Sequence, residues 1–404
     1  MISIPANSTL QPRISNGVYC FPSESTPIVK LDLLFEAGSA YQPQPLCATA
    51  ANRLCTVATA DMNAAQLAEF MDYRGIIIEP DTQAWQSSLS VYFLRRYAEE
   101  VLPVLGNMLR CPAFAEGDFN VWCGEKRQKM ATHELESSQI ARRLFYYTLY
   151  GGSHPLGRYA VPADVDRLDL TVVRSYHQEH YSRGADAVVL AGNVDDNLVT
   201  LVADQLLRKE KKGLLSETQL NTPAPSLSPL PSVQTTLRVG RLLPLRWDDP
   251  DYARLMLLTT MLGGYFGSRL MSNLREEKGY TYGIYARTQL YRASIVFYIT
   301  ADVAGGSADA ARSEIFHELE GMAHITDEEL QLVKQVFVGD FLRSVDGIFE
   351  RSERFCNMMA NGVTEQLTDN LRQALDTATT AELQELALRL LQPADMIVCR
   401  AGAE

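Results

Sequence analysis

The sequence predicts an α+β protein of two homologous domains, each a mainly antiparallel β-sheet with helices packed on one face. Three observations support this prediction. The 404 residues exceed one ordinary core and fit two domains of roughly 200 residues each. Strand-like and helical segments alternate along the whole chain, and the two halves end in closely similar segments.

The first half begins with an apolar, alternating strand at residues 28–37, which Gly38 ends. An alanine-rich, weakly helical segment follows at 46–60, and then a stronger amphipathic helix at 64–74, which Gly75 ends. The other elements predicted for this half are strands at 76–79, 87–93 and 188–192, and helices at 97–109, 116–137 and 139–150.

The composition changes after residue 205. A charge run occupies 208–212, and the segment 221–232 contains four closely spaced prolines, Pro223, Pro225, Pro229 and Pro231. Such spacing excludes a helix or an inner strand, so we interpret this segment as a semi-rigid surface connector rather than a binding motif. The sequence therefore predicts an N-terminal domain at 1–205, a linker at 206–232 and a C-terminal domain at 233–404.

An internal repeat supports the two-domain prediction. Residues 186–192 (DAVVLAG) have a counterpart at 395–402 (DMIVCRAG), and each segment follows a polar helix with an Asp-rich or Thr-rich cap. The capping box at 326–329 (TDEE) opens a helix that runs to about Ser344. In position, this helix corresponds to the one that begins near Glu116.

The stretch 261–282 contains signals for the start and the end of a helix, together with two side chains that could take part in catalysis or binding. Ser268 offers an N-cap hydroxyl to a helix, which Gly279 ends in the left-handed conformation. Two strands joined by a turn follow. Arg275 therefore lies at the end of a helix and Tyr282 at the start of a strand.

Composition excludes several classes of function. The net charge of −12, without a basic stripe, argues against nucleic-acid binding, and no segment is apolar enough for a membrane span. The N-terminus lacks the features of a secretory signal, and the seven scattered cysteines contain no C-x-x-C pair, so we expect reduced thiols and a cytoplasmic protein. The sequence contains neither a Walker-type phosphate loop nor a G-x-S-x-G elbow.

Several motifs, taken together, resemble the pitrilysin or insulinase-type (inverzincin) zinc metallopeptidase family in its short bacterial form of two homologous domains. The resemblance spans nearly the whole chain. The motifs are PDY at 250–252, MLGGYFGSRL at 261–270, LREEKGYTY at 274–282, HPLGR at 154–158, YHQEHY at 176–181 and LAGNV at 190–194.

The resemblance implies that Arg275 and Tyr282 form a substrate-side pair that faces the zinc centre of an active first domain. A phenol can donate a hydrogen bond to the oxyanion that forms when water adds to a peptide carbonyl, and a guanidinium can hold substrate carbonyls. The alternative is that Arg275 is an ordinary residue on a helix surface and Tyr282 an ordinary aromatic residue of a strand.

The zinc motif of the family, H-x-x-E-H, is absent, because none of the six histidines fits its spacing. In the aligned position, Thr49 and Arg53 replace the two histidines and Asn52 replaces the glutamate that activates water. The third ligand falls near Thr132, with Glu134 close by. Arginine does not ligate zinc and asparagine cannot accept a proton, so we predict no zinc and no catalytic metal on this chain.

His177 and His180 are the other metal-like pair, since residues three apart share a helix face. Their segment matches a structural helix of the family, and we interpret them as structural.

These observations predict a zinc-free subunit of a peptidase that binds a peptide substrate and contributes Arg275 and Tyr282. Zinc is expected on a homologous partner subunit in a heterodimer, with a homodimer as the other arrangement. The chain alone should be inactive. One alternative is an inactive binding or scaffold protein, like the core proteins of respiratory cytochrome bc complexes, which resemble this family yet serve as scaffolds. Another is a self-sufficient peptidase whose metal site lies elsewhere.

Overall fold

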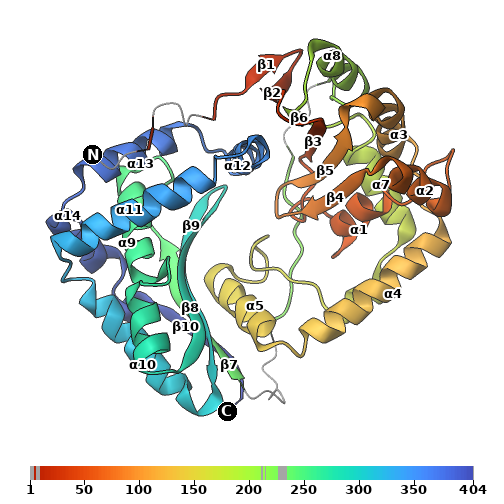
Figure 1. Cartoon of the computed structure of the whole chain (residues 1–404). Coiled ribbons are helices and arrows are strands. Elements are labelled where there is room, and N and C mark those ends of the chain that lie inside the picture. The colour runs from red at the N-terminus through yellow and green to blue at the C-terminus, as the bar shows by residue number, and fades with distance from the viewer. Residues whose placement is uncertain (1–3, 6–9, 211–212, 214, 226–233, 404) are drawn as a thin grey trace.

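The computed structural model of the chain describes residues 4–5, 10–210, 213, 215–225 and 234–403 (Figure 1). Residues 1–205 are referred to below as the first half and residues 233–404 as the second half. These boundaries remain a prediction, and part of the predicted linker, including Pro229 and Pro231, lies outside the described residues.

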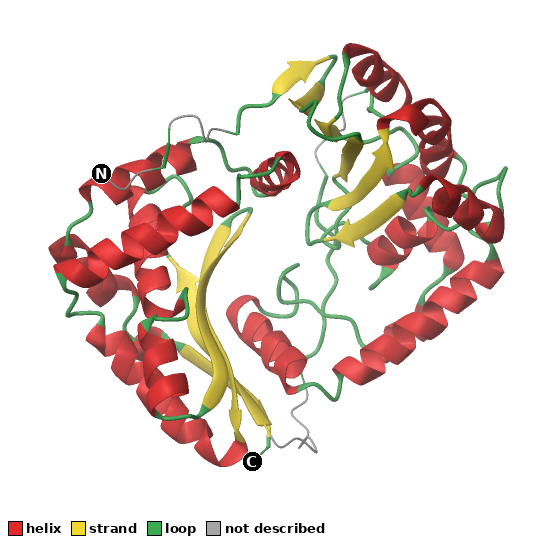
Figure 2. Cartoon of the chain, viewed as in Figure 1, coloured by secondary structure: helices red, strands yellow, loops and turns green. Residues whose placement is uncertain are grey.

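Two β-sheets, one from each half, face each other across the middle of the described structure (Figure 2). The first sheet has six strands in the order β1-β2-β6-β3-β5-β4, and its pairs are antiparallel except for β2 with β6. Its strands are β1 (Arg13–Ser15), β2 (Val18–Pro22), β3 (Ile28–Phe35), β4 (Ile77–Thr82), β5 (Ser87–Leu94) and β6 (Ala187–Gly192).

The second sheet has four strands in the order β10-β7-β9-β8, all antiparallel. They are β7 (Gln234–Leu243), β8 (Thr281–Tyr291), β9 (Ser294–Ala304) and β10 (Ile397–Gly402). This order repeats that of four adjacent strands of the first sheet, β6-β3-β5-β4. The repeated segments 186–192 and 395–402 thus contribute equivalent strands, β6 and β10.

The helices lie mostly on the outer side of each sheet (Figure 2). In the first half they are α1 (Cys47–Leu54), α2 (Ala64–Arg74), α3 (Ala98–Arg110), α4 (Glu116–His133), α5 (Ser137–Tyr150), α6 (Pro162–Arg167), α7 (Leu170–His180) and α8 (Asp196–Gln205). In the second half they are α9 (Pro250–Gly263), the π-helical η3 (Met271–Glu277), α10 (Ala308–Gly321), α11 (Asp327–Arg343), α12 (Ile348–Ala360), α13 (Gln366–Thr377) and α14 (Thr380–Leu390). In the part of the chain that the structure describes, no helix has both the length and the apolar character needed to cross a bilayer.

The predicted helix ends are visible in the backbone. Gly75 and Gly279 adopt positive φ values of 63° and 66°, where a residue with a Cβ atom would be strained, and each ends a helix directly before a β-hairpin. The hydroxyl of Thr326 accepts a hydrogen bond from the Glu329 backbone N–H, as predicted for a cap. The Glu329 carboxylate, however, binds Arg269 instead of completing the box.

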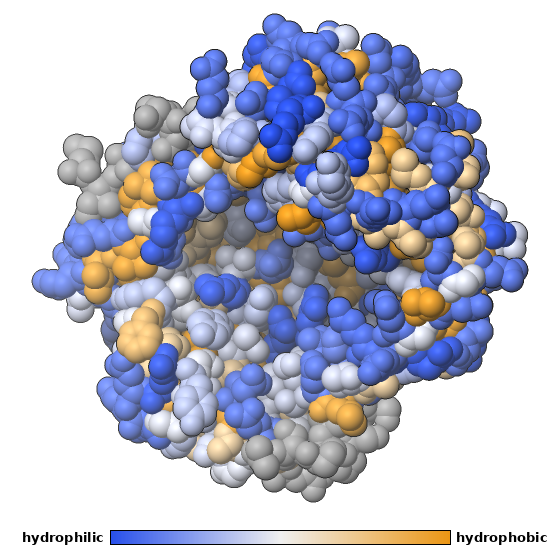
Figure 3. Space-filling model, turned by 45° about the vertical axis from the view of Figure 1, so that its right-hand side comes forward, coloured by the Kyte–Doolittle hydropathy of each residue, from blue (hydrophilic) through white to orange (hydrophobic). Residues whose placement is uncertain are grey.

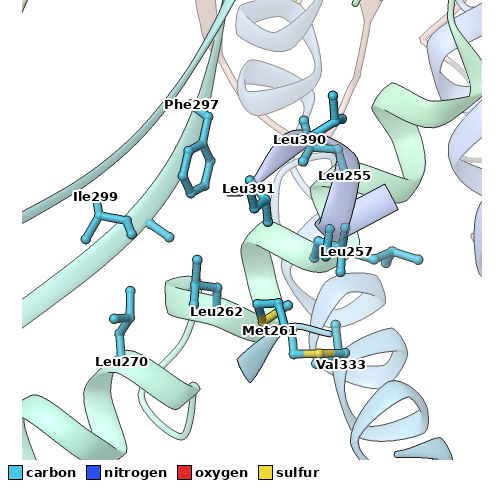
Figure 4. Packing of buried hydrophobic residues seen from close by; sticks show 14 of the residues in the cluster. Leu255, Leu257, Met261, Leu262, Leu270, Phe297, Ile299, Val333, Leu390 and Leu391 are labelled. Carbon is cyan, nitrogen blue, oxygen red and sulfur yellow. The ribbon is translucent and has the colours of Figure 1, made fainter. Parts of the chain in front are cut away.

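Each half has its own core on the helical face of its sheet. On β3, the alternating side chains of Val29, Leu31, Leu33 and Phe35 are fully buried beneath the first-half helices. In the second half, α9 packs between β9 and the outer helices (Figure 4). The residues labelled in this cluster include Leu255, Leu257, Met261 and Leu262 of α9, Phe297 and Ile299 of β9, and Val333 of α11.

The opposite face of each sheet is covered by a helix from the other half. Helix α12 of the second half packs on β2 and β6 of the first sheet, with Phe355 against Tyr19 and Phe21. Helix α5 of the first half packs on β7 and β10 of the second sheet, where Phe145 and Tyr146 are buried (Figure 1). The two halves therefore exchange helices, which the sequence patterns did not indicate.

Candidate functional site

Arg275 lies in η3, where the chain departs from the ordinary helix that we predicted. The Lys278 backbone N–H donates to the Asn273 carbonyl five residues earlier, at 3.0 Å, which is π-helical hydrogen bonding. The amide of Asn273 fixes this segment to α10 by donating to the carboxylates of Glu314 and Glu318, at 3.0 and 2.7 Å. Ser268 precedes the helix as predicted, but its buried hydroxyl has no hydrogen-bond partner, so the predicted side-chain cap is wrong.

Tyr282 lies in a β-bulge at the start of β8. The pairing of β8 with β9 shifts register between Thr281 and Ile284, which leaves Tyr282 without a partner on β9. The Thr281 hydroxyl donates to the Asp302 carbonyl at 2.7 Å and holds the bulge in place. Bulges commonly redirect a side chain, and the Tyr282 side chain is 89% exposed here.

Both side chains are available for a ligand. The Arg275 guanidinium stacks on the Phe266 ring at 4.7 Å, and Phe266 is itself 59% exposed. Within the described residues, neither Arg275 nor Tyr282 makes a side-chain hydrogen bond or an ion pair. A phenol donor and a guanidinium thus stand free on two consecutive irregular elements.

The positions aligned with the zinc motif lie on α1 and have structural contacts. Asn52 is buried, and its side-chain amide donates to the carbonyls of Asp81 and Ser88 at 2.7 and 3.2 Å, which ties α1 to β4 and β5. Arg53 is exposed, and Thr49 borders a surface pocket. None of these side chains can act as a zinc ligand in this arrangement.

Glu134, the remaining acidic candidate, does not complete a metal site. It caps the end of α4 and forms an ion pair with Arg143 of α5, while the Thr132 hydroxyl donates to the Gln128 carbonyl. Among the described residues, no group of three or more His, Cys, Asp or Glu is arranged to hold a metal ion. The residues present therefore do not fit the zinc of the family.

We expect the purified chain, prepared without a histidine tag and dialysed against zinc, to contain no stoichiometric zinc, because the aligned positions supply too few ligands. Elemental analysis measures the metal content, with a Glu134→Gln variant as the control. One zinc per chain that disappears in the variant would contradict this prediction and support a self-sufficient peptidase.

His177 and His180 are buried parts of the first core. The His180 ring nitrogen Nδ1 lies 3.0 Å from the Glu36 carbonyl, and its ring packs on Tyr176. The His177 ring stacks on Tyr181, and burial lowers the pKa of His177 to about 4. The pair is structural, in agreement with the interpretation from the sequence.

The His177 pKa predicts a loss of stability in mild acid. In the unfolded chain His177 takes up a proton below its ordinary pKa of 6.5, whereas the folded state resists protonation down to about 4. The unfolded state therefore binds more protons between these values, and stability falls as the pH is lowered from 6.5 towards 4. At pH 4.5, protonation of His177 in the unfolded state should lower the free energy of unfolding by about 2–3 kcal/mol.

Urea unfolding at pH 7.0 and 4.5 measures this effect, with a His177→Gln variant as the control. The wild-type protein should lose about 2–3 kcal/mol more than the variant on acidification. Equal losses for the two proteins would show that His177 is not the group responsible.

A cleft of about 510 Å³ lies between the halves. Figure 3 shows a hollow near the middle of the molecule, with many hydrophilic residues around it. Residues of both halves line the cleft, among them Trp85, Arg142, Arg158, Gln289 and Tyr291. A second pocket of about 500 Å³ shares Arg158 with this cleft and extends to Thr49 of α1.

The sequence analysis did not identify the aromatic and basic residues of this cleft. They come from separate elements of both halves, so no local spacing connects them. The Tyr291 and Tyr146 hydroxyls bond each other at 2.8 Å across the two halves. The HPLGR motif at 154–158, which the sequence had marked, contributes three residues to the cleft, Pro155, Leu156 and Arg158.

Residues 167–337, which include Arg275 and Tyr282, match a family model described as the peptidase M16 inactive domain. The chain is a relative of the M16 peptidases. The resemblance to the pitrilysin or insulinase-type peptidases is therefore confirmed, and this chain lacks their zinc motif.

Several bacterial proteins are similar to this chain over more than half of its length. An uncharacterised zinc protease of Mycobacterium leprae is 26% identical over 277 residues, which cover 65% of this chain and 62% of that protein. The match thus spans less than two thirds of that relative. A Helicobacter pylori protein named as a non-peptidase homolog is 20% identical over 249 residues, 58% of this chain and 56% of that protein.

Among solved structures, the peptidase M16 inactive domain from Pseudomonas fluorescens has a TM-score of 0.81 and 22% identity, and the match covers 96% of this chain and 97% of that one. At this identity the likeness concerns the fold alone. It confirms the predicted α+β architecture of antiparallel-rich sheets with helices.

Proposed function

We propose that this chain is the zinc-free subunit of a two-chain M16-type peptidase and supplies Arg275 and Tyr282 to the peptide substrate. The observation that carries the proposal is that, among the described residues, neither side chain has a hydrogen-bond or ion-pair partner, although one lies in a π-helix and the other in a β-bulge. Both kinds of irregularity occur frequently at functional sites.

In this proposal the partner is a homologous subunit with an intact H-x-x-E-H motif, which would hold the zinc and supply the water-activating chemistry. The Tyr282 hydroxyl donates to the oxyanion that develops in the transition state. The Arg275 guanidinium donates to substrate carbonyl oxygens and so fixes the position of the peptide. The stack on Phe266 limits the conformational freedom of Arg275 before substrate binds.

The Tyr282→Phe variant should lower kcat/KM for peptide hydrolysis by at least tenfold when this chain is mixed with a motif-bearing M16 partner. The loss of one oxyanion donor typically reduces the rate by about 10²–10³. Peptide cleavage by the mixed subunits is the measurement. Tyr285→Phe, on the same strand and 46% exposed, is the matched control and should leave the rate unchanged. Equal rates for wild type and Tyr282→Phe would exclude the proposed role.

A second candidate function is an inactive binding or scaffold protein. It is favoured by the match to an inactive-domain model and by the similarity to a Helicobacter pylori protein named as a non-peptidase homolog. Affinity purification distinguishes the two functions, since the scaffold function predicts recovery of an unrelated complex and no motif-bearing peptidase.

We also propose a cytoplasmic location. All seven cysteines are free thiols, and five of them are buried: Cys20, Cys47, Cys55, Cys123 and Cys399. Free cysteines are typical of reducing compartments.

A further inference from the structure

The segment 215–225 runs along the first half as an extended chain, although we had interpreted it as a surface connector. The Thr218 backbone N–H donates to the Ala40 carbonyl at 2.8 Å, and the Thr222 N–H donates to the Gly152 carbonyl at 3.1 Å. The Thr218 hydroxyl lies within 2.8 Å of the Gln42 carbonyl. Two loops of the first half therefore hold the segment by its main chain.

Side chains of the first half hold the same segment from outside. An Arg158 guanidinium nitrogen donates to the Thr218 carbonyl at 3.1 Å, and the Tyr159 hydroxyl donates to the Pro223 carbonyl at 3.0 Å. Backbone N–H and carbonyl groups of the segment are therefore hydrogen-bonded to the first half both near Thr218 and near Thr222 and Pro223. A peptide bound in a groove is held in the same way.

The burial of the segment alternates with a period of two. Thr218, Leu220 and Thr222 are partly buried, whereas Gln219 and Asn221 are exposed. An extended chain places alternate side chains on opposite faces, so one face of the segment points into the first half. Leu220 and Thr222, together with Asn221, border the pocket that extends to Thr49.

Hydrogen bonds that do not involve the segment fix one side of the groove. One wall is held by the Ser39 and Ala40 N–H groups, which donate to the carbonyls of Gln83 and Ala84 at 3.0 and 2.6 Å. The other wall contains Gly152, where a Cβ atom would lie 2.1 Å from the Thr222 carbonyl oxygen. A glycine is therefore required at this position for the close approach of the two main chains.

One end of the groove accepts a carboxylate. The Trp85 indole Nε1 donates to the Glu217 carboxylate at 2.6 Å. Burial lowers the pKa of Arg158, and the nearby Glu217 carboxylate partly opposes this effect. Arg142 lines the adjoining cleft. A hydrogen bond to an ionised group is stronger than one between neutral groups, so this contact favours an acidic residue at the position of Glu217.

We propose that this groove is a peptide-binding site that is occupied by the chain's own segment 217–223. Its ligands are extended peptides with an acidic residue, followed by small or apolar side chains at alternate positions. An external peptide of this kind binds when the internal segment leaves. The site is separate from Arg275 and Tyr282, so the proposal does not depend on the function given above.

The test uses a fluorescein-labelled peptide with the sequence of residues 215–224 (LSETQLNTPA). A release variant, Thr218→Pro/Thr222→Pro, removes both backbone donors and the threonine hydroxyls that hold the internal segment. The matched control is Gln219→Ala/Asn221→Ala, which changes the two exposed side chains of the same segment. Fluorescence anisotropy measures binding to the whole chain.

The release variant should bind the peptide saturably, while the wild type and the control should bind at least tenfold more weakly. Replacing the glutamate of the peptide by glutamine should weaken binding about tenfold, and adding Gly152→Val to the release variant should abolish it. A folded release variant that does not bind, or a wild type that binds equally well, would overturn the proposal.

If the release variant does not fold, hydrogen exchange of the wild type provides the test. The amides of Thr218 and Thr222 should exchange at least tenfold more slowly than those of Gln219 and Asn221, because only the first pair is bonded to the groove. Equal exchange rates at the four amides would overturn the proposal.

Discussion

The Asp32→Ala variant should lose about 3–5 kcal/mol of unfolding free energy, because the change leaves Lys30 charged and unpaired in the interior. Lys30 and Asp32 form an ion pair of 3.0 Å on β3, with side chains that are only 4% and 3% exposed. Burial acts to lower the pKa of Lys30, but the Asp32 carboxylate outweighs it and raises that pKa above its usual value.

The pair lies on the sheet face that α12 covers. The Asp32 carboxylate also accepts hydrogen bonds from the Ser90 hydroxyl at 2.6 Å and from the Cys356 thiol of α12 at 3.7 Å. Loss of this carboxylate should therefore weaken the docking of α12 as well as the sheet itself. Hydrogen exchange in α12 should increase together with the loss of stability.

Urea unfolding measures the effect, and the double variant Lys30→Met/Asp32→Leu is the control. Replacing both charges by apolar side chains removes the unpaired ion and should recover most of the stability, since buried ion pairs often contribute little beyond an apolar pair. If the single and double variants lose the same amount, the cost arises from packing and not from the uncompensated charge.

The second large effect is expected for Phe145→Ala, a loss of about 3–5 kcal/mol. Phe145 belongs to α5 of the first half, yet its fully buried ring contacts the second sheet. It packs against Tyr298 of β9 at 6.3 Å, and the Arg238 guanidinium of β7 lies 5.3 Å from its centre. Truncation leaves a cavity and removes aromatic contacts around a buried cation.

The strands in which hydrogen exchange increases distinguish this prediction from a general loss of stability. Hydrogen exchange should increase in β7 and β10 of the second half, although the substitution is in the first half. Leu135→Ala, which alters a 65% exposed side chain just before α5, is the control and should change neither stability nor exchange. Increased exchange confined to the first half would contradict the observed packing of α5.

Local signals in the sequence predicted most of the fold. Gly75 and Gly279 marked helix ends because few other residues adopt a positive φ there, and the alternation in residues 28–35 marked β3 because each side chain of a strand points to one face. The long helix predicted at 116–137 ends earlier, at His133. The next residue, Glu134, forms an ion pair with Arg143. That ion pair connects two separate helices, so no local sequence pattern predicts it.

The features that escaped prediction depend on contacts between distant residues. The packing of α5 and α12 on the sheet of the other half could not be predicted, because an apolar helix face has the same sequence pattern whichever sheet it covers. The π-helix around Arg275 depends on Asn273 and its two glutamates in α10, some forty residues later. The alternation of Thr218, Leu220 and Thr222 was a local signal for an extended segment. We did not use it, because the neighbouring prolines indicated a surface connector.

The exchanged helices also bear on why a chain without zinc ligands keeps two complete halves. If the first half were deleted, the second sheet would lose α5 and expose the apolar surface around Val296 to water. If the second half were deleted, the first sheet would lose α12 and uncover Val189 and the buried ion pair. Each half therefore forms part of the other's interior, so the loss of either half would leave the remaining one with exposed apolar surface.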